Sequence, residues 1–203
     1  MHLPTIRLLA AAALLAAVGP VAHAQDQTVR VRGTIERVDG DVYVIKARGG
    51  SEVKVKLQDN ALVVSLIKAS LADIKQGSYV GVSGMPQADG SQKALEVHIF
   101  PEAMRGTGDG HRPWDLQPSS TMTNGAVDQA VASSDGQVLT LKYKDGEKKI
   151  IVAPDTPVVT YLPGDKGELK PGATVFVAAA TKLPDGTLQT QRINVGRGVA
   201  PPM

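Results

Sequence analysis

The stretch Gly33-Thr34-Ile35-Glu36 recurs in the second half of the chain as Gly125-Ala126-Val127-Asp128. Further matches follow in the same order along each half: 71–77 with 167–172, 79–82 with 174–177, and Asp89-Gly90 with Asp185-Gly186. A repeat on this scale indicates two copies of one small domain. We therefore expect one domain over 28–102 and a second over 123–198.

The apolar pattern of both copies is that of β-strands. Val29, Val31 and Ile35 alternate with polar residues, the period-two pattern of a half-buried strand. Similar patterns and turn residues predict the other strands: 42–47, 52–57, 79–83 and 92–100 in the first copy, and 125–132, 137–143, 148–153, 174–179 and 188–195 in the second. A short helix is expected at 65–75, whereas the corresponding 155–172 is rich in Pro and Gly and is expected to be a loop.

This order of elements is that of a small Greek-key barrel of the OB type. We therefore expect an all-β protein of two tandem five-stranded OB-like Greek-key barrels, with a short helix in the first. Comparison of the copies also predicts the core. Tyr43 aligns with Leu139, Ile45 with Leu141, and Val80 with Val175, so we expect these positions to be buried.

Residues 1–24 are typical of a secretory signal peptide. Arg7 precedes a short apolar run at 8–18, and Ala22-His23-Ala24 has the small-x-small form of a cleavage site. Cleavage near Ala24 predicts a periplasmic protein, and the mature sequence contains no segment apolar enough to span a membrane.

The composition excludes several classes of function. The chain of 203 residues contains no Cys, which excludes disulfides, Cys-ligated zinc and thiol catalysis. The formal net charge is only +2 and aromatic residues are 3% of the chain, which argues against a nucleic-acid partner. No nucleophile-elbow motif, phosphate-binding loop or recognisable pair of catalytic carboxylates is present, so no enzymatic activity is expected.

The residues between the copies, 103–122, have the Gly/Pro content of a linker, and 199–203 that of a frayed tail. The linker nevertheless contains the only Trp of the chain. The candidate binding or docking residues are concentrated around it: Asp109, His111, Arg112, Trp114 and Asp115. They form either a loop site or a plug that docks the two barrels, and Trp114 is expected to be largely buried.

Metal binding would have to use His111. Four-coordinate zinc would need three further ligands, for which only Asp109, Asp115 and His98 are candidates. His98 aligns with Asn194 on a polar strand face, which predicts a solvated surface residue. No cofactor is therefore expected, and any binding of zinc or copper should be weak.

The order of a signal peptide, Gly-Thr-Ile-Glu at 33–36, Leu-Ala-Asp-Ile-Lys-Gln-Gly at 71–77 and Gly-His-Arg-Pro-Trp-Asp-Leu at 110–116 resembles a known group. The group consists of exported bacterial proteins with tandem OB-like domains of unknown function, and some of them are labelled automatically as metal ABC transporter permeases. The resemblance covers 28–198 and implies the fold without implying an activity or site residues. A permease needs several membrane spans, which the mature sequence lacks.

Together these observations predict a non-catalytic periplasmic binding or interaction module. Its partner would be an envelope protein or a small solute whose identity the sequence leaves open. Two alternatives remain: a metal-handling accessory protein associated with metal uptake, and an envelope stress protein that binds a small solute.

Overall fold

The computed structural model describes residues 28–134 and 136–201. The predicted signal peptide, 1–24, lies outside the described residues. The described part consists of β-strands and three single-turn 3-10 helices: β1 (Val29–Asp39), β2 (Val42–Ala47), β3 (Glu52–Ala69), η1 (Leu71–Asp73), β4 (Tyr79–Pro86), β5 (Gln92–Phe100), η2 (Glu102–Met104), β6 (Gly110–Pro113), β7 (Thr121–Ser133), β8 (Gly136–Tyr143), β9 (Gly146–Val152), β10 (Val158–Pro163), η3 (Lys166–Glu168), β11 (Thr174–Lys182) and β12 (Leu188–Gly196).

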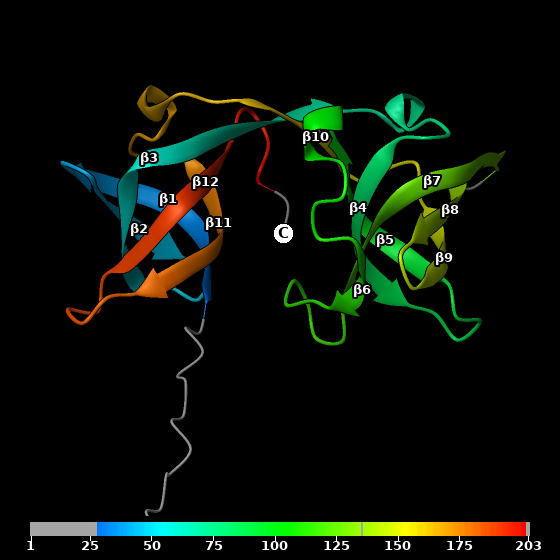
Figure 1. Ribbon diagram of the computed structural model, residues 1–203, viewed down its shortest axis with the longest axis horizontal. Coiled ribbons are helices and arrows are strands. Elements are labelled where there is room, and N and C mark those ends of the chain that lie inside the picture. Colours follow the sequence, from blue (N-terminus) through cyan, green and yellow to red (C-terminus); the bar gives the residue numbers. More distant parts are fainter. Residues whose placement is uncertain (1–27, 135, 202–203) are drawn as a thin grey trace, which may run out of the picture.

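The strands form two lobes that lie side by side (Figure 1). One lobe is a closed five-stranded barrel in the order β1-β2-β3-β12-β11, in which only the β3–β12 pair is parallel. We call it the first barrel. In the other lobe, β7, β8, β9, β5 and β4 pair in an equivalent order, and the parallel β5–β9 contact is limited to two residue pairs. We call this set the second ring.

Each lobe takes strands from both halves of the chain. The first barrel combines β1–β3 with β11 and β12, and the second ring combines β7–β9 with β4 and β5. The expectation that 28–102 and 123–198 each form a barrel of their own is therefore corrected. Each of these segments contributes three strands to one lobe and two to the other.

The length of β3 accounts for this arrangement. With 18 residues at about 3.3 Å each it extends over about 60 Å, far more than an ordinary strand. It carries the chain out of the first barrel and along the top of the molecule (Figure 1). The helix predicted at 65–75 is wrong. Residues up to Ala69 are extended because they pair with neighbouring strands: 64–66 with both β12 and β10, and 67–69 with β10 alone. Only the turn η1 follows.

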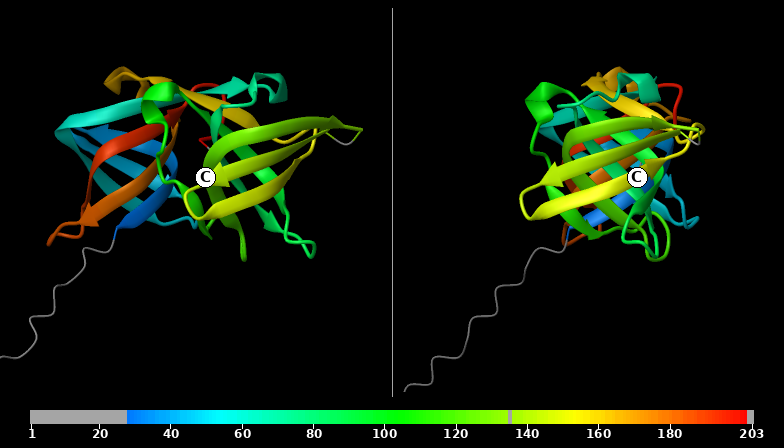
Figure 2. Two further views of the ribbon diagram at one scale, coloured as in Figure 1. Left: turned by 45° about the vertical axis from the view of Figure 1, so that its right-hand side comes forward. Right: turned by 90° about the vertical axis from the view of Figure 1, so that its right-hand side faces the viewer.

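The chain returns from the second ring to the first barrel through β10, which lies within the segment predicted to be a loop. It pairs antiparallel with the second part of β3, with Leu66 opposite Tyr161, and parallel with β5. The two crossing strands therefore lie side by side between the lobes, as the turned views also show (Figure 2). Pro157 and Pro163 lie next to β10 or at its end, where the missing N–H groups are tolerated.

Two separate apolar cores fill the lobes. One core gathers side chains such as Ile35 and Val175 inside the first barrel, and the other gathers Val80 and Val127 inside the second ring. The predicted core positions are confirmed: Tyr43, Ile45, Val80, Leu139, Leu141 and Val175 are all less than 9% exposed. Period-two alternation therefore identified these core positions, although Val44 on the opposite face of β2 is buried as well. Alternation could not identify the strand neighbours.

Equivalent hydrogen bonds join the two halves of the chain in each lobe. The N–H of Gly172 donates to the carbonyl of Ile35 at 2.8 Å, and the N–H of Gly77 donates to the carbonyl of Val127 at 2.8 Å. Each bond connects residues from different halves of the chain. The matched glycines before strands β4 and β11 therefore occupy equivalent positions.

The linker and the tail are more ordered than their composition indicates. The linker range 103–122 contains β6, which pairs antiparallel with β7, and the first residues of β7 itself. In the tail, Pro201 is buried and the N–H of Arg197 donates to the carbonyl of Leu66. The rest of the predicted tail, 202–203, lies outside the described residues.

The exchange of strands predicts how a nicked chain behaves. We expect a protein cleaved at a protease site engineered at 117–119, an exposed loop, to stay together, because each lobe needs strands from both fragments. Size-exclusion chromatography of the nicked protein without denaturant should give one peak at the mass of the intact chain. Separation into two folded fragments would contradict the pairing.

Gly33 provides a test of the close approach of β1 and β2. A Cβ at this position would lie 2.1 Å from the carbonyl oxygen of Lys46, whereas a Cβ at Gly49 would meet nothing within 4 Å. Gly33→Ala should lower the free energy of unfolding by about 1–3 kcal/mol, and Gly49→Ala should stay within about 0.5 kcal/mol of the wild type. Urea unfolding of both variants measures the difference, and equal midpoints would contradict it.

Candidate functional site

The five residues predicted from the linker do not form one cluster. Alternation along β6 separates His111 from Arg112. Arg112 lines a cavity between the lobes, which Trp114 also lines, and we call it the seam cavity. The imidazole Nδ1 of His111 instead lies 2.7 Å from the Thr123 hydroxyl, outside that cavity.

The two aspartates serve as docking groups. Asp109 accepts hydrogen bonds from the Tyr79 hydroxyl at 3.1 Å and from the Lys144 backbone N–H at 2.8 Å. Asp115 accepts two from the Arg32 guanidinium, at 2.7 and 3.0 Å, which keep the pKa of its carboxyl below the usual range. Asp115 thereby ties the linker, which follows the second ring, to the first barrel.

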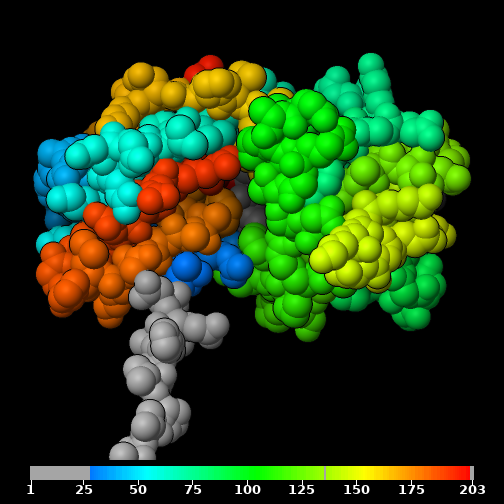
Figure 3. Space-filling view, in the orientation of Figure 1, coloured from blue at the N-terminus to red at the C-terminus, as the bar shows by residue number. Residues whose placement is uncertain are grey.

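Trp114 also contacts the first barrel. The guanidinium of Arg30 lies 4.3 Å from the centre of its ring, and those of Arg112 and Arg32 lie at 5.5 and 5.9 Å. Most of its surface is buried, as predicted. Its indole Nε1 is enclosed and has no hydrogen-bond partner among the described residues. The segment around 100–115, green in Figure 3, is the part of the right-hand lobe that meets the left-hand lobe.

The seam cavity has a volume of about 170 Å³ and is lined from both lobes and from the crossing strands. The lining residues are Leu66, His98, Phe100, Met104, Thr107, Arg112, Trp114, Met122, Asn124, Tyr161, Phe176, Ala178, Arg192 and Asn194. Aromatic rings provide much of its wall. Phe100 and Tyr161 stack with their centres 5.1 Å apart, and His98 meets Tyr161 edge-on at 6.1 Å.

His98 is the largest departure from the prediction for this region. It is 5% exposed rather than solvated, because its side chain faces the seam between the lobes, where the rings of Phe100 and Tyr161 lie against it. Its Nδ1 lies 2.9 Å from the Tyr161 hydroxyl, and its Nε2 has no partner among the described residues. Burial lowers the pKa of the imidazole to about 3, so the ring is neutral at ordinary pH.

Asn124 contributes a third unpartnered atom. It is 4% exposed, and its Nδ2 donates to the carbonyl of Thr107 at 2.8 Å. This bond orients the amide, and Oδ1 is left without a donor in the described part of the chain. A buried polar atom without a partner costs about 1–3 kcal/mol, and three side chains that carry such atoms, those of His98, Trp114 and Asn124, are among the lining of this one cavity.

Sequence reasoning found Arg112 and Trp114, missed Asn124, Tyr161 and Arg192, and placed His98 on a solvated face. One signal was present: His98 and Asn194 are polar at matching positions of the last strand of each half, and both are about 5% exposed. From this alignment, the strand face that carries both residues was predicted to be exposed to solvent. In the structure this face is the seam between the lobes.

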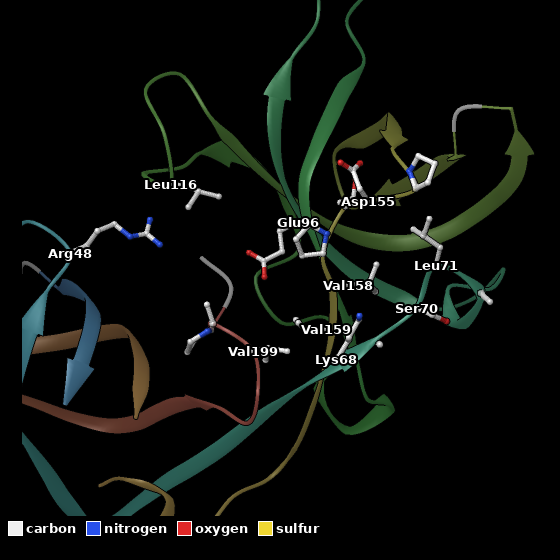
Figure 4. Close-up of a pocket in the computed structure, with 17 residues that line it drawn as sticks. Arg48, Lys68, Ser70, Leu71, Glu96, Leu116, Asp155, Val158, Val159 and Val199 are labelled. Atoms are coloured by element: carbon white, nitrogen blue, oxygen red, sulfur yellow. The ribbon is translucent and has the colours of Figure 1, made fainter. Parts of the chain in front are cut away.

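A larger hollow of about 790 Å³ lies around the crossing strands and the C-terminal residues (Figure 4). The side chains of Val158, Val159 and Glu96 come from β10 and β5, Val199 comes from the tail, and Arg48 and Leu116 lie across the space. Its lining includes none of the unpartnered buried atoms. The seam cavity is therefore the better candidate site.

Within the described residues no group of three or more His, Asp or Glu side chains is arranged to hold a metal ion. Also within them, no helix has the length and apolar character needed to cross a membrane. Comparison with known proteins yields no match, whether to a family model, a curated protein or a solved structure.

His98 makes the stability of the protein depend on pH. The unfolded chain takes up a proton below the ordinary value of 6.5, whereas the folded chain does so only near pH 3. Stability is therefore lost as pH falls from 6.5 toward 3, by up to about 1.4 kcal/mol per pH unit from this group.

The substitution His98→Asn introduces the residue type found at the matching position, Asn194, and removes the titrating imidazole. We expect the stability difference between pH 7 and pH 4.5 to shrink by about 2–3 kcal/mol relative to the wild type. Urea unfolding of both proteins at the two pH values measures it. An identical pH dependence would show that His98 titrates normally.

Proposed function

We propose that the protein is a non-catalytic binding module of the bacterial envelope that takes a small solute into the seam cavity. One observation carries this proposal: His98, Trp114 and Asn124 line the same space, and each has a buried polar atom without a partner among the described residues. A bound solute that supplied their hydrogen bonds would remove an energetic cost that the folded chain otherwise retains.

The fold supports this interpretation. In an OB barrel the first strand pairs with the second and the fourth, and the third pairs with the fifth in parallel. The first barrel has this order with β11 and β12 as its last two strands, and the second ring has it with β4 and β5. We interpret the molecule as two OB-like Greek-key barrels of a tandem repeat that have exchanged their last two strands.

The chemistry of the cavity favours binding over catalysis. An efficient general acid or base has a pKa near the working pH, and that of His98 lies near 3. Burial raises the pKa of the Tyr161 hydroxyl, so this group also stays neutral at neutral pH. Neither group would exchange protons readily with a substrate at neutral pH.

The signal-like sequence at 1–24 supports export to the periplasm, and the absence of Cys is compatible with that compartment because no disulfide has to form.

The alternative of metal handling through His111 has less support. Burial and the positive charges of Lys148 and Arg112 lower the pKa of His111, and the same charges would repel a metal cation.

A ligand screen tests the proposal. Small solutes and the zinc and copper ions are added singly to the mature protein, and the melting temperature is followed together with the fluorescence of Trp114, the only Trp. A solute that binds the native state at 100 times its Kd should stabilise it by about 2.7 kcal/mol. We expect at least one solute, and neither metal ion, to raise the melting temperature and change the fluorescence.

Controls locate the effect. Phe176→Leu alters the cavity wall and should weaken a solute that binds there, whereas the exposed Leu62→Ala should not. Stabilisation by a metal that is lost in His111→Ala would favour the metal-handling alternative. Stabilisation by a solute without any fluorescence change would place its site away from the seam.

A further inference from the structure

We infer that the ligand of the seam cavity is a small carboxylate that also carries a hydroxyl or amino group. This inference rests on the proposed function and names the class of solute. Three features of the cavity lead to it: the charge of its lining, the hydrogen-bond character of its unpartnered atoms, and its size.

The lining of the cavity carries positive charge. Arg112 and Arg192 line it, and none of its lining residues is an aspartate or a glutamate. The guanidiniums of Arg30 and Arg32 add to this charge at the Trp114 ring, where Asp115 is the carboxylate that pairs with them. A solute that carries a carboxylate is favoured over one that carries none in such surroundings.

The two nitrogen atoms without partners belong to side chains that line the cavity, and both have the character of donors. The indole Nε1 of Trp114 is a donor only. For the neutral ring of His98, the Tyr161 hydroxyl can donate to Nδ1, which places the ring hydrogen on Nε2. The other tautomer would leave both the Tyr161 hydrogen and the Nε2 lone pair without partners. The favoured arrangement therefore presents two N–H groups, which suit the oxygens of a carboxylate.

Asn124 requires a hydrogen-bond donor on the ligand, because its unpartnered atom is an acceptor. Its amide is oriented by the bond from Nδ2 to the carbonyl of Thr107, so Oδ1 can only accept. A simple carboxylate has no donor for this atom, whereas a hydroxyl or an amino group has one. The cavity therefore combines positive charge and N–H donors with the acceptor oxygen of Asn124.

The volume limits the size of the ligand. A water molecule takes about 30 Å³ in the liquid, so about 170 Å³ corresponds to about six non-hydrogen atoms. Lactate and alanine have about this size. The rings of Phe100, Tyr161 and Phe176 and the side chain of Leu66 provide apolar surface for their carbon atoms.

Calorimetric titration of the mature protein with lactate and alanine tests the inference, with Trp114 fluorescence as a second readout. Two comparison ligands have nearly the same shape: lactamide lacks the charge, and propionate lacks the hydroxyl. We expect lactate or alanine to bind with a Kd below about 1 mM, and both comparison ligands to bind at least about tenfold more weakly.

Variants test the residues. Arg112→Gln removes a cavity charge, and Asn124→Asp adds a negative charge at the acceptor; each should weaken binding by about tenfold or more. Arg37→Gln is the matched control, because it removes a guanidinium that pairs with Glu52 and Asp39 away from the cavity. Circular dichroism of each variant establishes that it is folded, and the comparison ligands test the wild type independently of any variant.

Two results would overturn the inference alone. One is failure of lactate and alanine to bind while another solute of the screen binds with a Trp114 response, which leaves the proposed function intact. The other is lactate binding that propionate or lactamide matches, or that Arg112→Gln leaves unchanged. If no solute of any class binds at the seam, the proposed function fails as well.

Discussion

The antiparallel pairing of β10 with the second part of β3 is the contact on which the rest of the molecule depends. These two strands carry the chain from one lobe to the other. Each also has a parallel partner: β3 pairs with β12, and β10 pairs with β5. Without this pairing the crossing segments would expose two long edges of unpaired backbone groups. With it, the two cores are joined by a continuous sheet.

The crossing also creates the candidate site. Leu66 and Tyr161 lie opposite each other at the middle of the β3–β10 pair, and both line the seam cavity. The polar face of β5, which would be solvated in an isolated barrel, is covered there, so His98 is buried. The linker then completes the cavity with Arg112 and Trp114, which dock on the first barrel through Asp115 and the arginines of β1.

The energetics of the seam differ from those of the two cores. The cores are apolar and closely packed, and they account for the stability of each lobe. The seam instead encloses cations, neutral donors and an acceptor, several of them without partners. Such an arrangement lowers stability, and the same unpartnered groups give the seam the ability to select a ligand by its hydrogen bonds and charge.

The sequence by itself determined which residues face the cores and where most turns occur. Positions such as Tyr43, Ile45 and Val175 could be predicted because alternation along a strand depends only on the neighbouring residues. It also drew attention to Arg112 and Trp114 because scarce residue types are concentrated around them.

Only the tertiary structure decided which strands close which lobe. The matching strands of the two halves have similar apolar patterns, so either half could supply the partner, and local sequence does not distinguish them. The decision depends on β3 continuing as a strand to Ala69, because pairing with β12 up to Leu66 and with β10 from Val64 to Ala69 overrides a helical pattern. The burial of His98 and the convergence of Asn124, Tyr161 and Arg192 follow from that crossing, because these residues are far apart in the chain and meet only where the two lobes come together.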